Sequence, residues 1–288
     1  MVHFGRVSTA MVTPFDKKGH IDFSKTTQLV NYLIDNGTES LVVAGTTGES
    51  PTLTKEEKLA LFNHVVKVVG KRIPVIAGTG GNNTYATVEL TKKAEQLGVD
   101  AIMLVGPYYN KPNQEGLYQH FKTVAEATSL PVMVYNIPGR SAVNIHPDTI
   151  IRLSKISNIV AVKEASGDLN AMTRIIANTD SDFDLYSGDD ALTVPVLSIG
   201  GAGVVSVASH VVGKEMQEMV RAYLNGDNEK TAKLHQKLLP LMLGLFAAPS
   251  PGPVKTALQI KGLDVGSVRL PLVPLTELER STLIKLLN

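Results

Sequence analysis

Eight short, β-rich apolar runs constrain the fold of this chain more than any other feature. They span residues 7–12, 41–45, 74–78, 101–106, 131–136, 159–163, 183–187 and 202–207. Several of them are apolar on both faces, as parallel strands covered by helices are. Because stretches with helical spacing separate these runs, the pattern indicates an α/β protein with a parallel sheet.

The stretches between the runs carry helix signals of their own. Within residues 55–70, Leu59, Phe62, Val66 and Val69 fall on one apolar stripe, which predicts an amphipathic helix. Side chains that can cap a helix N-terminus precede several of these stretches. We expect N-caps at Asp22 and Asp168, and a capping box formed by Thr54 and Glu57.

Eight strands that alternate with helices predict a (β/α)8 TIM barrel, for which the length of 288 residues is sufficient. A doubly wound open sheet is the alternative, since strand order is not visible in a sequence. No strand run follows residue 208, and the remaining segments are predicted to be helical: 209–225, 229–246, 253–261 and 274–286. We therefore expect a barrel domain that carries the active site over residues 1–225, and a C-terminal helical domain over residues 226–288.

Composition excludes several classes of function. The formal net charge of +1 does not favour a nucleic-acid or membrane surface as the partner. No apolar run approaches the roughly 20 residues of a membrane span, and the N-terminus does not read as a signal peptide. The chain has no cysteine, which excludes disulfides and thiolate chemistry and fits a cytoplasmic protein.

Lys163 ends the apolar run 159–163, at the end of a strand where parallel α/β sheets carry their active sites. If its side chain lies inside the barrel, burial lowers its pKa and leaves a neutral amine that can attack a carbonyl group. The alternative is a structural lysine that extends into solvent past the strand end, paired with Glu164.

Other strand ends also carry polar side chains. Tyr135 lies near the end of the run 131–136 and is either a core tyrosine or a proton relay. Arg140 follows a Pro-Gly turn, from which a guanidinium can bind a carboxylate. The loop Gly45–Ser50 offers open backbone N–H groups and the hydroxyls of Thr46 and Thr47. The paired tyrosines Tyr108 and Tyr109 indicate a subunit contact or a site wall.

Several kinds of chemistry have no support. The histidines are scattered without metal-ligand spacing, so no metal site is predicted. The glycine clusters do not match the nucleotide-binding fingerprints, and there is no Gly-x-Ser-x-Gly elbow of a serine hydrolase. We therefore expect no cofactor.

Taken together and in order, the motifs GTTGES, GPYYNKP, YNIPGRS, VAVKEASGD, YSGDD and PGPVKTALQIKG resemble those of the dihydrodipicolinate synthase family of pyruvate-dependent class I aldolases. The likeness extends over essentially the whole chain. It implies a (β/α)8 barrel with a C-terminal helical domain, usually assembled as a homotetramer of tight dimers. It also implies condensation of pyruvate with L-aspartate-4-semialdehyde to 4-hydroxy-tetrahydrodipicolinate, in the diaminopimelate route of lysine biosynthesis.

The resemblance also implies roles for individual residues. Lys163 matches the Schiff-base lysine, and Tyr135 matches the proton donor and acceptor. Thr46 and Tyr109 match the relay between that tyrosine and solvent, with Tyr109 supplied by the neighbouring subunit. The positions that match substrate-binding residues are Thr47 and the backbone of Val205 for pyruvate, Arg140 for the carboxylate of the semialdehyde, and Gly188 in the same pocket.

Two other functions are weighed against this one. An N-acetylneuraminate or keto-deoxy-sugar-acid lyase of the same superfamily typically has serine in place of Thr46 and no arginine at the position of Arg140. A non-catalytic keto-acid-binding barrel would lack the lysine or the tyrosine, and both are present. These residues favour the synthase.

Some family members are inhibited by lysine at the dimer interface. Positions that hold histidines and a glutamate in those members are Lys55, Lys58 and Ala86 here, whereas Ser50, Asn82 and Tyr108 are retained. Two added cations and a lost carboxylate disfavour a cationic amino acid. We therefore expect lysine feedback to be weak or absent.

Overall fold

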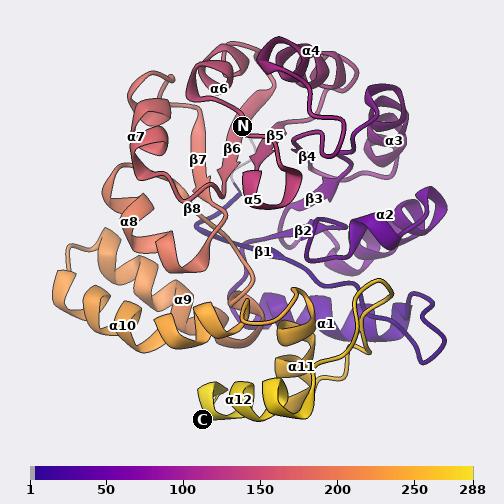
Figure 1. Cartoon of the computed structure of the whole chain (residues 1–288), viewed down its shortest axis with the longest axis vertical. Helices are drawn as coiled ribbons and strands as arrows, with labels where there is room; N and C mark the ends of the chain where they lie inside the picture. Colours follow the sequence, from indigo (N-terminus) through magenta and orange to yellow (C-terminus); the bar gives the residue numbers. More distant parts are fainter. Residues whose placement is uncertain (1–3, 288) are drawn as a thin grey trace. The chain divides into compact units, whose positions relative to one another are not determined.

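Eight parallel strands form a closed barrel in the computed structural model of the chain, which describes residues 4–287 (Figure 1). Each strand pairs with its neighbours in sequence order. The strands are β1 (Val7–Ala10), β2 (Ser40–Val43), β3 (Val75–Gly78), β4 (Ala101–Val105), β5 (Val132–Asn136), β6 (Ile159–Glu164), β7 (Asp184–Ser187) and β8 (Gly203–Ser206). Each strand coincides closely with a predicted run. The TIM barrel is therefore confirmed, and the open-sheet alternative is wrong.

Helices follow the strands throughout the chain. They are α1 (Phe23–Asp35), α2 (Lys55–Val69), α3 (Thr84–Gln96), α4 (Gln114–Ala125), α5 (Pro138–Ser141), α6 (Pro147–Leu153), α7 (Leu169–Ala177), α8 (Thr193–Ser198), α9 (Ser209–Leu224), α10 (Asn228–Gly244), α11 (Gly252–Ile260) and α12 (Glu277–Leu287). Two short 3₁₀ turns, η1 (Ser50–Thr52) and η2 (Asp190–Leu192), follow β2 and β7. Helices α9 to α12 confirm the predicted helical character after residue 208.

The chain divides into two compact units, each described by itself below. The central unit is Ile76–Val205. Its strands are almost wholly buried, and its helices α3, α4, α6, α7 and α8 lie outside them, each in contact with the next (Figure 1). A layer of helices on one side and a packed barrel interior on the other explain why these strands are apolar on both faces.

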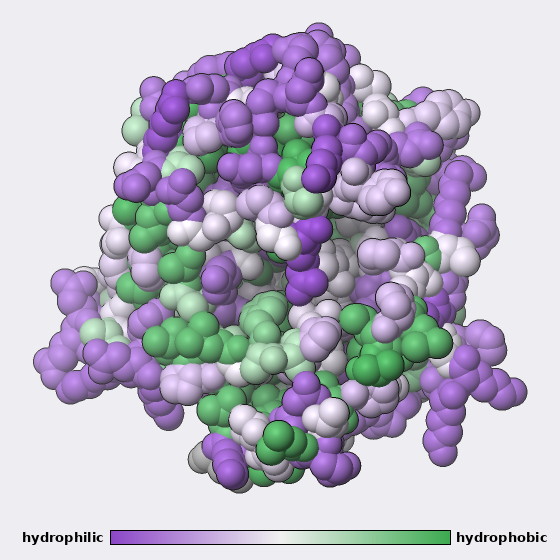
Figure 2. Space-filling model, in the orientation of Figure 1, coloured by the Kyte–Doolittle hydropathy of each residue, from purple (hydrophilic) through white to green (hydrophobic). Residues whose placement is uncertain are grey.

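The terminal unit joins Phe4–Val75 to Ser206–Asn288. Within it, α9 packs against β1, α1, α10 and α11, and α12 packs against α10 and α11. Hydrophobic side chains show at the surface over these last helices, in the lower part of the view (Figure 2). The predicted domain boundary after residue 225 falls between α9 and α10. Because the compact units divide the chain elsewhere, that boundary stays a prediction.

The expected helix caps are present. Thr54 accepts a hydrogen bond from the backbone of Glu57, whose carboxylate accepts one in return, which confirms the capping box. Asp22 and Asp168 accept hydrogen bonds at the N-termini of α1 and α7. The predicted apolar stripe of α2 is only partly right. Its buried residues are Leu61, Phe62, Val65 and Val69, whereas Leu59 and Val66 are half-buried. The buried face is therefore rotated slightly from the one that spacing suggests.

Replacement of Thr54 by alanine tests the contribution of the capping box. Thr54→Ala removes the acceptor for the Glu57 N–H and should lower the free energy of unfolding by about 1 kcal/mol. Thr173→Ala is the matched control. That hydroxyl lies on the exposed side of α7 and donates only to the carbonyl of Leu169. Urea denaturation of both variants checks this, and equal midpoints would contradict the expected role of the cap.

Candidate active site

Three polar residues lie in register at the ends of neighbouring strands in the central unit. Tyr135 of β5 pairs in register with Lys163 of β6, and Lys163 pairs in register with Tyr186 of β7. Residues in register on parallel strands point to the same side of the sheet. Strand pairing therefore brings Tyr135 and Lys163 together, as expected from their places in the sequence.

Lys163 is buried, with only 5% of its surface exposed. Its ammonium nitrogen lies 4.2 Å from the centre of the Tyr135 ring, and Tyr135 is itself buried. Gly188 leaves room for this side chain, since a Cβ atom there would lie 3.1 Å from Lys163 Cε and 2.6 Å from Ala165 Cβ. The alternative in which Lys163 extends into solvent is therefore wrong.

The surroundings of Lys163 favour its neutral form. Burial lowers the pKa of Lys163 from 10.5 to about 8. The carboxylate of Asp190 raises this pKa and the guanidinium of Arg140 lowers it, both as smaller effects. Asp190 is itself buried, in the η2 turn after β7. A useful fraction of the amine is therefore neutral near pH 8 and able to attack a carbonyl carbon.

Glu164, the next residue in β6, does not pair with Lys163. Its carboxylate accepts hydrogen bonds from the Asn136 side chain at 2.9 Å and from the Ser166 backbone at 2.8 Å. Asn136 Oδ1 in turn accepts from the backbone of Ile145. This buried pair ties the end of β5 to the end of β6. This pair was not predicted from the sequence, although Asn136 directly follows Tyr135 and Glu164 directly follows Lys163.

The other predicted residues of the central unit differ in exposure. Arg140 is exposed on the short helix α5, close enough to affect the pKa of Lys163. Val205 is buried in β8. Tyr109 is 88% exposed and has a left-handed backbone, with a φ of 72°. A large aromatic ring held out in this way suits a contact with another molecule.

Thr46 and Thr47 belong to the terminal unit, in the loop between β2 and η1. Thr46 is half-buried and Thr47 is 6% exposed. The loop begins and ends on non-glycine residues in the left-handed region, with φ values of 53° at Ala44 and 57° at Glu49. Such conformations are costly and gather at functional sites. Between them, Gly48 approaches the backbone closely, since a Cβ there would lie 3.1 Å from Ala44 Cα.

Acids and histidines are dispersed over the described part of the chain. Within residues 4–287 the structure contains no group of three or more His, Cys, Asp or Glu side chains arranged to hold a metal ion. The same residues include no helix long and apolar enough to cross a membrane.

A (β/α)8 barrel with a buried lysine of lowered pKa at a strand end defines a class of protein, the class I aldolases that work through a Schiff base. Comparison with known proteins narrows the class. The model of the dihydrodipicolinate synthetase family matches residues 3–288, and the chain belongs to this family.

Similar proteins cover nearly the whole chain. It is 66% identical to the 4-hydroxy-tetrahydrodipicolinate synthase of Bacillus subtilis over 98% of both sequences. It is 63% identical to that of Bacillus velezensis, over 100% of this chain and 99% of the relative. Among solved structures, a dihydrodipicolinate synthase from Bacillus anthracis superposes with a TM-score of 0.99 at 66% identity, covering 100% of this chain and 98% of the other.

Replacements of the two charges near Lys163 should shift its reactivity in opposite directions. Asp190→Asn removes an anion, so the pKa of Lys163 falls further and trapping by pyruvate becomes efficient at lower pH. Arg140→Ala removes a cation, so the pKa rises and the profile moves to higher pH. Pyruvate with cyanoborohydride over about pH 6 to pH 10, with the Lys163 adduct measured by mass spectrometry, checks this. Shifts in the same direction in both variants would contradict it.

Proposed function

We infer that this chain condenses pyruvate with L-aspartate-4-semialdehyde to 4-hydroxy-tetrahydrodipicolinate. The observation that carries the inference is the buried amine of Lys163 beside Tyr135, in a chain that belongs to the dihydrodipicolinate synthetase family. The high identity to relatives named 4-hydroxy-tetrahydrodipicolinate synthase supports the same reaction. The lyase and the non-catalytic barrel are not favoured.

The proposed chemistry begins at the neutral amine. Lys163 attacks the carbonyl carbon of pyruvate and water leaves, which gives a protonated imine. This imine withdraws electrons, so the pyruvate methyl group loses a proton and the imine becomes an enamine. The enamine carbon attacks the aldehyde of the second substrate. The amino group of that substrate then attacks the imine carbon, closes the ring and releases Lys163.

Other groups assist each step in this proposal. Tyr135 shuttles protons during imine formation and carbon–carbon bond formation, and Thr46 with Tyr109 connects it to solvent. Thr47 and the backbone of Val205 bind the carboxylate of pyruvate. Arg140 binds the carboxylate of the semialdehyde, and Gly188 borders the same pocket. No cofactor is proposed, because the imine itself serves as the electron sink.

We further propose a cytoplasmic homotetramer built from tight dimers, in which Tyr109 reaches the site of a neighbouring subunit. The exposure of Tyr109 supports this, since 88% of its surface is uncovered in a single chain. One solved structure at 44% identity and a TM-score of 0.96 is described as a monomeric dihydrodipicolinate synthase variant.

The function is tested with the purified protein and both substrates. We expect consumption of pyruvate in the presence of L-aspartate-4-semialdehyde, no release of pyruvate from N-acetylneuraminate, and loss of activity in Lys163→Ala. Arg140→Ala should raise KM for the semialdehyde about ten-fold or more, with a small change for pyruvate. Arg152→Ala is the control, because that arginine pairs with Glu115 on an exposed surface. Cleavage of N-acetylneuraminate would instead identify a lyase.

Lysine feedback is tested separately. A dihydrodipicolinate synthase of Cyanidioschyzon merolae, 46% identical with a TM-score of 0.97, has been solved with lysine bound. Here Ala86 is exposed and offers no carboxylate, and Lys58 is a half-buried cation whose pKa is lowered by burial. Asn82 is retained and donates to the carbonyl of Tyr108.

Millimolar lysine should therefore leave the activity nearly unchanged. The triple variant Lys55→His, Lys58→His, Ala86→Glu should become sensitive, because it removes two cations and adds an anion. Ala86→Gln, which adds bulk without charge, is the control. Strong inhibition of the unchanged protein in an activity titration would overturn this prediction.

A further inference from the structure

A fully buried ion pair joins the loop after β2 to helix α11 within the terminal unit. Lys255 Nζ lies 2.6 Å from Glu49 Oε1, and only 2% and 1% of the two side chains are exposed. The ammonium also donates to the carbonyl of Ser267 at 2.8 Å and lies 4.2 Å from the centre of the Phe15 ring. Burial of two charged groups costs free energy, which indicates that this ion pair has a role other than stability alone.

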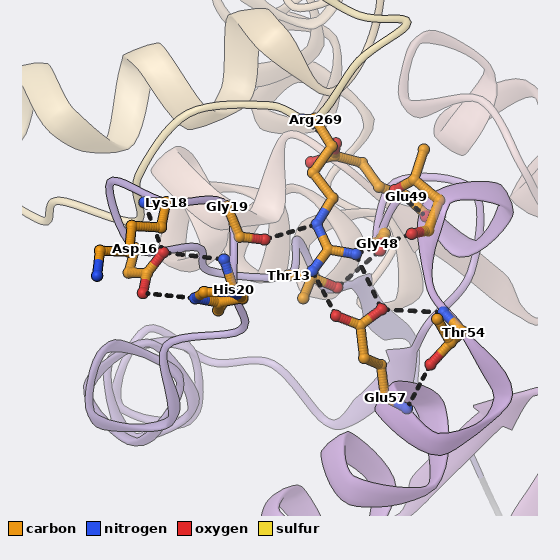
Figure 3. A network of polar contacts seen from close by, with 11 residues as sticks. Thr13, Asp16, Lys18, Gly19, His20, Gly48, Glu49, Thr54, Glu57 and Arg269 are labelled. Atoms are coloured by element: carbon orange, nitrogen blue, oxygen red, sulfur yellow. Dashed lines mark hydrogen bonds and ion pairs between the residues drawn. The ribbon is translucent and has the colours of Figure 1, made fainter.

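Arg269 completes the cluster from the segment between α11 and α12. Its backbone N–H donates to Glu49 Oε2 at 2.8 Å, so the carboxylate is held at both oxygens. Its guanidinium donates to Gly19 and Glu57 (Figure 3). It also donates to the carbonyl of Thr52 and lies over the ring of Phe15. Glu57 belongs to the capping box of α2. Arg269 therefore connects the N-terminus of α2 to the carboxylate of Glu49.

The backbone of Glu49 needs this support. Glu49 has a φ of 57° and a ψ of 37°, a left-handed conformation that a side chain makes unfavourable. In this conformation its N–H donates to the carbonyl of Thr46 at 3.0 Å, and the N–H of Ser50 donates to Gly45 at 3.2 Å. These two hydrogen bonds close the turn that carries Thr46 and Thr47. The carboxylate of Glu49 therefore anchors the shape of that turn.

A further contact holds the turn from the other side. The Thr13 hydroxyl donates to the carbonyl of Gly48 at 2.7 Å (Figure 3). The Gly48 carbonyl and the Glu49 carboxylate are thus both occupied by partners outside the loop. These contacts fix the backbone next to Thr46 and Thr47. A fixed backbone suits a loop that presents hydroxyls and N–H groups to a small anion.

We propose that Glu49, Lys255 and Arg269 are positioning residues for pyruvate, which hold the turn Gly45–Ser50 in the conformation that binds the keto-acid carboxylate. The proposal rests on the role proposed above for Thr46 and Thr47. The C-terminal helices then act on the reaction through one buried charge cluster. Removal of the cluster should impair the first substrate and spare the second, because Arg140 lies on a different loop.

The test compares KM for each substrate and the rate of borohydride trapping of Lys163 by pyruvate. Lys255→Met removes the cation with little change of volume, and should raise KM for pyruvate and slow trapping about ten-fold or more. KM for the semialdehyde should stay within about two-fold. Glu49→Gln keeps the size of the side chain and should have a smaller effect in the same direction, non-additive with Lys255→Met.

Lys25→Met is the matched control. Lys25 pairs with Asp264 at 2.7 Å, so it also links an N-terminal helix to the C-terminal segment, without contact to the turn. It should leave both KM values unchanged. Thr47→Val tests the proposed site directly and should raise KM for pyruvate. Retention of normal pyruvate binding in Thr47→Val would refute the site itself.

Normal pyruvate binding in Lys255→Met, with Thr47→Val impaired, would overturn the positioning role alone. A purely structural role would lower the fraction of protein that can be trapped at saturating pyruvate, and would leave both KM values of the folded fraction unchanged. That outcome also overturns the proposal. If Lys255→Met does not fold, the same comparison is made with Glu49→Gln, which retains an acceptor oxygen for one of the two partners.

Discussion

The cost of burying an ammonium group at Lys163 is the constraint on which the active site depends. The lowering of its pKa from 10.5 to about 8 corresponds to about 3 kcal/mol of folding free energy. Because the folded pKa is the lower one, this cost is fully present below pH 8, where both states hold the proton. It disappears as the pH rises through 10.5, where both have lost it. The protein is therefore less stable near neutral pH because the same burial makes the amine reactive.

The residues around Lys163 follow from this constraint. Gly188 has no side chain, so it leaves room for the buried side chain of Lys163. Asn136 and Ser166 occupy the carboxylate of Glu164, which lies next in the strand and would otherwise offer a competing charge. Asp190 raises the pKa of Lys163 and Arg140 lowers it, so the two nearby charges oppose each other. Burial alone then sets the direction of the shift.

Local patterns were sufficient to predict the strands and the helix caps, and to place Tyr135 and Lys163 at strand ends. Period-two alternation and strand-end placement depend only on neighbouring residues. Contacts between distant segments could not be predicted in this way. Glu49 and Arg269 stand 220 positions apart, and nothing in either motif indicates that they meet. The buried face of α2 differs from the predicted one for a related reason, because contacts with distant segments determine which side of a helix is covered.

Lys163 and Lys255 show how a single physical effect produces two functions. Burial lowers the pKa of each lysine to about 8. Lys255 has a carboxylate at 2.6 Å, which raises its pKa against the effect of burial and binds its ammonium group to the loop after β2. Removal of one partner of such a pair costs about 3–5 kcal/mol, so the pair resists any change of the loop it holds. Lys163 faces the ring of Tyr135 instead, at the end of a barrel strand. The partner, and not the burial, decides whether a buried lysine anchors a structure or attacks a substrate.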